Sequence, residues 1–136
     1  MTRTQPRPTG SWLWPLVADL ACVLALAAGG KRSHEPGDSA WVVLAIVWPF
    51  ALAAGLAHVW LVSRGRRTGR AWPEGVTVVA VTYGLGMLLR AISGRGLAPG
   101  FLVVAAVFLA LTMLGWRGAA LLVTRLRAAR SRERAG

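Results

Sequence analysis

Charged side chains are scarce in this chain of 136 residues, and acidic side chains are scarcer than basic ones. Only 15% of the residues are charged, five residues are acidic, and Cys22 is the single cysteine. One cysteine excludes an intrachain disulfide, and the sequence has no ligand spacing typical of a metal site. Soluble domains of this size carry charge around their whole surface, so the shortage argues against one. We expect neither a metal nor a cofactor.

Long apolar runs take the place of the missing charge. Hydrophobic residues make up 55% of the chain, the mean hydropathy is +0.53, and apolar segments occupy 12–30, 40–62, 74–93 and 98–116. Each segment has about the 20 residues with which a helix crosses the hydrocarbon core of a bilayer. The sequence therefore predicts an all-α, polytopic membrane protein whose four transmembrane helices form an antiparallel bundle over 11–117.

The ends of the chain differ from this bundle in composition. Residues 1–10 are polar and contain two prolines, which predicts a flexible tail. Residues 118–136 form a basic, amphipathic tail that either extends the fourth helix over 118–130 or lies along the membrane interface. The first apolar run could also be a signal peptide cleaved after 25–27, but Asp19 in the middle of the run and three later spans favour a retained helix.

Basic residues are unevenly distributed around the four segments. The N-terminal tail, the connection at 63–72 and the C-terminal side hold 12 of the 16 basic residues. The positive-inside rule then places both termini in the cytoplasm. The same positions, just outside apolar segments, argue against nucleic-acid binding, which the net charge of +11 would otherwise suggest. Anionic lipid is the partner that we expect for the five tail arginines: Arg125, Arg127, Arg130, Arg132 and Arg134.

Among the polar side chains inside the apolar segments, the candidates for a role within the membrane are Asp19, His58, Tyr83 and Arg90. A carboxylate within a membrane needs a partner. Counted along the helices, His58 lies within about a turn of Asp19 in depth, whereas Arg90 is roughly 12 Å away. We therefore expect Asp19 to pair with His58 rather than with Arg90. Arg90 would meet Glu35 or Asp38 of the outer loop. The candidate site residues of this loop are Arg32, His34, Glu35 and Asp38.

Two further patterns concern packing. Pro49 in the middle of the second segment predicts a kink, and its neighbour Trp48 is expected in the bundle core or in the wall of a cavity, with core packing preferred. Small residues recur at helical spacing in the first segment and predict the face that is buried in the bundle. These residues are Ala18, Ala21, Cys22, Ala25 and Gly29.

Three stretches resemble one known family. They are DLACVLALAAGGKRSH from Asp19 to His34, WPF from Trp48 to Phe50, and GMLLRAISGRG from Gly86 to Gly96. They resemble small, mostly bacterial and archaeal membrane proteins classed as domain of unknown function thirty fifty-four, over roughly Pro15 to Gly115. The resemblance implies four helices in the plasma membrane of a bacterium. It implies no activity, cofactor or catalytic residue.

Functional motifs are lacking. The sequence contains no phosphate-binding loop, nucleophile elbow, metal-binding helix motif or carboxylate pair. The favoured hypothesis is a non-enzymatic helical bundle that forms a homo-oligomer or partners another membrane protein. A small transporter or channel subunit that uses the intramembrane polar residues is the first alternative. A membrane enzyme, or an accessory to one, is the second.

Overall fold

The computed structural model describes residues 12–31 and 39–135, and every regular element within these ranges is helical. In chain order the elements are α1 (Leu13–Lys31), α2 (Ser39–Ser63), η1 (Ala71–Gly75), α3 (Val76–Ile92) and α4 (Pro99–Ala135). The predictions for the N-terminal tail and for the outer-loop residues Arg32, His34, Glu35 and Asp38 lie outside the described residues.

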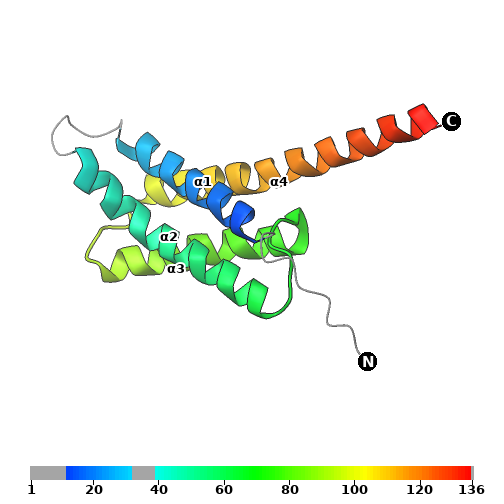
Figure 1. Ribbon diagram of the computed structural model, residues 1–136. Coiled ribbons are helices and arrows are strands. Elements are labelled where there is room, and N and C mark those ends of the chain that lie inside the picture. The colour runs from blue at the N-terminus through cyan, green and yellow to red at the C-terminus, as the bar shows by residue number, and fades with distance from the viewer. Residues whose placement is uncertain (1–11, 32–38, 136) are drawn as a thin grey trace, which may run out of the picture.

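The four long helices form a bundle in which neighbours run in opposite directions (Figure 1). α1 packs against α2 and α4, and α3 packs against the same two helices. One end of the bundle holds the start of α1, the end of α2 and the start of α3, and α4 continues outward from it (Figure 1). The opposite end holds the end of α1, the start of α2 and the α3–α4 connection.

The core lies where the four helices meet. Phe50, Leu109 and Met113 are fully enclosed there. α2 and α3 approach closely at Gly86, because a Cβ atom there would overlap the Phe50 ring. A glycine at this position therefore lets a large ring pack directly on the backbone of α3, as small residues do in membrane bundles.

The outside of the bundle is as apolar as its core. Large hydrophobic side chains face outward along all four helices, among them Ile92 at 73% exposure and Leu111 at 69%. In water such a surface would drive aggregation, whereas in a bilayer lipid tails cover it. All four of the long helices are long and apolar enough to cross a membrane.

Two packing predictions for the first two helices hold only in part: Ala18 and Cys22 are half-buried, and Trp48 lines a hollow but is not in the core. The small residues Ala21, Ala25 and Gly29 face outward, and the buried side of α1 carries Asp19 and Val23 instead. The polar group selects this side, because it needs partners within the bundle. Trp48 is 39% exposed and lines an outer hollow on α2. Pro49 and Phe50, the next two residues, are buried in the core instead.

The ends of the third and fourth helices also differ from the predicted spans. η1 begins at Ala71, and Trp72 within it has extended backbone, so the chain bends before α3 starts. α4 runs without interruption from Pro99 to Ala135, which settles that residues 118–130 extend the fourth helix. At 37 residues it is about 55 Å long and exceeds the roughly 30 Å hydrocarbon core. Its last turns project beyond the bundle (Figure 1).

Candidate functional site: the Asp19 network

A cluster of polar side chains is enclosed near the end of the bundle from which α4 projects. Asp19 and His58 are 0% exposed and Arg117 is 1% exposed. They come from α1, α2 and α4 respectively, and Trp116 of α4 joins them. We refer to these four residues as the Asp19 network.

The Asp19 carboxylate accepts four hydrogen bonds. Arg117 Nη1 lies 2.7 Å from Oδ1 and Arg117 Nη2 lies 2.6 Å from Oδ2, so the guanidinium binds both oxygens. Trp116 Nε1 donates to Oδ1 at 2.9 Å, and His58 Nε2 lies 2.8 Å from Oδ2. An ionised carboxylate offers about four lone-pair positions. All four are used here.

The Arg117 guanidinium is satisfied to the same degree. Besides its two bonds to Asp19, Nη1 donates to the Met113 carbonyl at 2.7 Å. Nε and Nη2 both donate to the Thr68 carbonyl, at 3.2 and 3.0 Å. A guanidinium carries five N–H donors, and each of them has an acceptor within the chain. The guanidinium carbon of Arg117 also lies over the Trp116 ring, 4.4 Å from the ring centroid.

Helix periodicity and a close glycine bring Arg117 into this position. Ala105, Leu109 and Met113 form a fully buried stripe with a spacing of four residues, and Arg117 continues it by one turn. Gly75 makes room for the side chain, since a Cβ atom there would lie 2.8 Å from Arg117 Cδ.

The α2–α3 connection closes over the network. Thr68 is buried and supplies the carbonyl that binds Arg117. Arg66 of the same connection donates to Glu74 at 3.2 Å, and Glu74 is itself buried at the entry to α3. The connection between the second and third spans is therefore packed onto the bundle by charge-assisted hydrogen bonds.

Nearly all of the hydrogen-bonding capacity of the network is used internally. Because the carboxylate only accepts, the hydrogen between it and the histidine belongs to His58 Nε2. His58 Nδ1 is the one nitrogen of the network without a partner among the described residues. The described residues contain no group of three or more His, Cys, Asp or Glu side chains able to hold a metal ion. This arrangement fastens helices together and leaves almost no free ligand.

The other predicted intramembrane residues lie apart from the network. Tyr83 Oη donates to the Leu102 carbonyl at 3.2 Å, which ties α3 to α4. Arg90 lies toward the opposite end, with its guanidinium carbon 4.3 Å from the Phe101 ring centroid. The predicted meeting of Arg90 with Glu35 or Asp38 lies outside the described residues. The tail arginines are all exposed on the projecting turns of α4.

Depth along the helices predicts the contact between Asp19 and His58, but the sequence analysis missed Arg117 and Trp116. By its position, Arg117 is one of the basic residues that flank the fourth span, and Trp116 lies at the end of that span, where aromatic residues are common. The sequence contains no signal for Arg117, because nearly every residue of the fourth span is apolar and the buried stripe of Ala105, Leu109 and Met113 is evident only in the structure.

Fold and site together define the class: a multi-pass, all-α membrane protein with a buried, charge-balanced network. Within that class the family is shown by a match over residues 16–120 to the family described as "Protein of unknown function (DUF3054)". The match covers most of the chain, which therefore belongs to this family. No curated protein and no solved structure matches the chain.

Proposed function

We propose that this protein is a non-enzymatic helical bundle of the bacterial plasma membrane that assembles with itself or with another membrane protein. The observation that carries the proposal is the saturation of the Asp19 network. A catalytic carboxylate or histidine must present a free lone pair or proton to its substrate. Asp19 has no free lone pair, and Arg117 has no free N–H group. The lone pair of His58 Nδ1 has no partner among the described residues, but His58 is 0% exposed, so a substrate does not reach it.

The contacts of the network fit a fastening role. Asp19 joins α1 to α2 through His58 and to α4 through Arg117, and Arg117 joins the α2–α3 connection through Thr68. Three helices and one connection thus depend on a single carboxylate. Breaking a buried ion pair of this kind by removing one partner typically destabilises a protein by about 3–5 kcal/mol.

Two outward features support assembly. Ala21, Ala25 and Gly29 form a line with four-residue spacing on the exposed side of α1, a pattern that lets a second helix approach closely. Independently, α4 projects from the bundle with Leu122 and Leu126 exposed on neighbouring turns. An isolated helical extension of this length is marginal in water, so contact with a partner or a lipid surface stabilises it.

Cysteine crosslinking tests the assembly. Ala25→Cys in a Cys22→Ser background should form a disulfide-linked dimer in native membranes that contain the protein at low density. The reason is that the exposed sides of α1 from two copies of the chain would be in contact. Leu111→Cys is the matched control, since that residue faces outward on α4 at 69% exposure. A crosslinked product of a different mass at Ala25→Cys would identify a partner protein. Monomer alone, or equal crosslinking at both positions, would count against assembly through α1.

The proposal includes the orientation in the membrane, with both termini in the cytoplasm. The distribution of basic residues supports it, as the N-terminal tail, the connection at 63–72 and the C-terminal side hold 12 of 16. In the same Cys22→Ser background, an impermeant thiol reagent should label Ser33→Cys in intact cells and Gly69→Cys only after permeabilisation. Labelling of both positions from the same side would rule out this orientation.

Transport is a second candidate, favoured by one observation. Arg90 lines a cavity at the end of the bundle opposite the Asp19 network. A binding cavity near one end of a bundle whose other end is closed by an ion pair has the form of one state in alternating access. Purified protein in liposomes should then carry an organic anion, and Arg90→Gln should abolish the flux. A flux equal to that of empty liposomes would exclude this candidate.

A further inference from the structure

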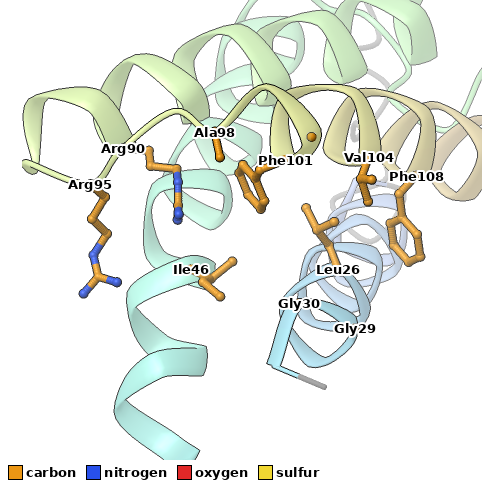
Figure 2. Close-up of a pocket in the computed structure, with 11 residues that line it drawn as sticks. Leu26, Gly29, Gly30, Ile46, Arg90, Arg95, Ala98, Phe101, Val104 and Phe108 are labelled. Atoms are coloured by element: carbon orange, nitrogen blue, oxygen red, sulfur yellow. The ribbon is translucent and has the colours of Figure 1, made fainter. Parts of the chain in front are cut away.

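A cavity of about 490 Å³ lies between α1, α2 and α4, at the end of the bundle away from the Asp19 network (Figure 2). Its volume is within the roughly 300–1,000 Å³ typical of ligand sites. Arg90 extends toward it from the end of α3, next to Phe101, whereas Arg95 of the α3–α4 connection lines its edge and its guanidinium lies on the outer side of α2 (Figure 2). We refer to it as the arginine cavity.

The guanidinium of Arg90 is fixed in position by an aromatic ring but has no counter-charge among the described residues. It lies over the Phe101 ring, which fixes its direction, while Nε and Nη1 are enclosed without a partner among the described residues. Enclosed charged donors that lack a hydrogen bond are costly, and more so within the depth of a membrane. Arg95 adds a second positive charge to the same cavity. An anion at this site would offset both positive charges.

The described part of the chain offers no such anion nearby. Asp19 and Glu74 bind Arg117 and Arg66 at the other end of the bundle, and Glu133 lies on the projecting turns of α4. Glu35 and Asp38, the acids expected near Arg90, lie outside the described residues. The alternative to an acid of the chain is an anionic ligand, and the experiments below separate the two.

The remaining walls indicate what else this ligand carries. Leu26 and Phe108 extend the arginine cavity away from the arginines along α1 and α4, so its deeper part is apolar (Figure 2). Val104 lines the same wall and is 59% exposed, so the cavity reaches the outward surface that lipid covers. A free inorganic anion would leave this apolar part unused. A molecule with an anionic head and an apolar chain would fill both parts.

We propose that the arginine cavity binds one phospholipid with an anionic headgroup. The lipid phosphate sits at Arg90 and Arg95, where guanidinium groups form the charge-assisted hydrogen bonds that phosphates favour. One acyl chain follows the apolar wall past Leu26 to Phe108. The lipid is a structural component that completes this end of the bundle, and its binding does not depend on the proposed assembly.

Native mass spectrometry of the purified protein tests the site. The two lipids to compare are phosphatidylglycerol and phosphatidylcholine with identical acyl chains. The wild-type protein should retain one phosphatidylglycerol after delipidation and bind it at least tenfold more tightly than phosphatidylcholine. Arg90→Gln/Arg95→Gln should weaken phosphatidylglycerol binding by about tenfold or more, since each charged donor set contributes substantially. A variant with glutamine at the five tail arginines should keep this lipid, because those residues lie at the other end of the molecule.

A second variant tests the apolar half without altering charge. Gly29 lines the arginine cavity, and a Cβ atom there would meet nothing within 4 Å. Gly29→Leu should therefore fold normally, occupy the cavity and displace the lipid. Gly84→Leu, at another position with open space, should not, and neither should Ala25→Leu, which alters the exposed line of α1 outside the cavity lining. Thermal unfolding in lipid-free detergent confirms that each variant is folded.

Three results would overturn the proposal. The first is unchanged phosphatidylglycerol retention in both Arg90→Gln/Arg95→Gln and Gly29→Leu. The second is protection by inorganic phosphate equal to that by the lipid, which would indicate a free-anion site. The third is an equal loss of stability in Arg90→Gln with and without phosphatidylglycerol, which would indicate a partner for Arg90 within the chain.

Discussion

Removal of the Asp19 carboxylate should destabilise the bundle more than the loss of hydrogen bonds alone explains. An interhelical hydrogen bond in a membrane protein contributes on average about 0.6 kcal/mol. Asp19→Ala also leaves the enclosed Arg117 guanidinium without a counter-charge, which costs about 3–5 kcal/mol. The stranded charge therefore dominates, and we expect a loss of about 3–5 kcal/mol in the free energy of unfolding.

Double-mutant cycles separate the contributions to this loss. Asp19→Ala/Arg117→Ala leaves no stranded charge, so it should cost clearly less than the sum of the two single changes, with a coupling of about 2 kcal/mol or more. The cycle of Asp19 with His58 should give a smaller coupling of about 1 kcal/mol, because a single hydrogen bond is lost. Arg117→Lys keeps the charge but loses the two parallel hydrogen bonds, so its free energy of unfolding should lie between those of wild type and Arg117→Ala.

Unfolding by sodium dodecyl sulfate in mixed micelles, followed by far-UV circular dichroism, provides the assay. All variants are to be measured in one detergent, so that the unfolded reference state is the same. Additive costs for Asp19→Ala and Arg117→Ala would refute the reasoning. A coupling with His58 larger than the coupling with Arg117 would also contradict it, since the ion pair would then not be the main contribution.

Three further predictions concern packing and the tail. Gly86→Ala should destabilise the bundle by about 1–3 kcal/mol by forcing the Phe50 ring away, whereas Gly84→Ala, whose added Cβ meets nothing within 4 Å, should be neutral in the same unfolding assay. Gly75→Ala should destabilise similarly and, by displacing Arg117, should reduce the coupling between Arg117 and Asp19. Glutamine at the five tail arginines should weaken binding of the tail peptide to anionic vesicles by about 1 kcal/mol per residue, more so at low salt; equal binding to neutral vesicles would contradict an electrostatic contact.

The sequence predicts the fold well because the apolar segments are long and their charged boundaries are clear. Four helices and their alternating directions follow from hydropathy and from loops that are short. The end of the fourth helix is different, because its apolar and basic residues suit both a helical extension and an interfacial helix. Only the continuous backbone of α4 through Arg117 distinguishes these two possibilities.

The site was half predictable from the sequence. Asp19 stands out as an acid in an apolar run, and counting residues along the helices selects His58 as its neighbour. Arg117 does not stand out, because a basic residue next to a span ordinarily marks the membrane boundary. The rotation of α1 about its own axis could not be predicted from the sequence either. Small residues on α1 suggested one buried face, whereas the need of Asp19 for partners imposed another.

Solid-state NMR on the protein in lipid bilayers tests the pairing of Asp19 with Arg117 most directly. In an Asp38→Asn background Asp19 is the sole aspartate of the chain. A sample labelled with ¹³C at the aspartate carboxyl and ¹⁵N at the arginine side chains should therefore report on Asp19 alone. The Nη atoms of Arg117 lie 2.7 and 2.6 Å from the Asp19 oxygens, which predicts strong dipolar dephasing of the carboxyl signal that disappears in Arg117→Lys. Absent dephasing, or dephasing unchanged by Arg117→Lys, would contradict the buried ion pair.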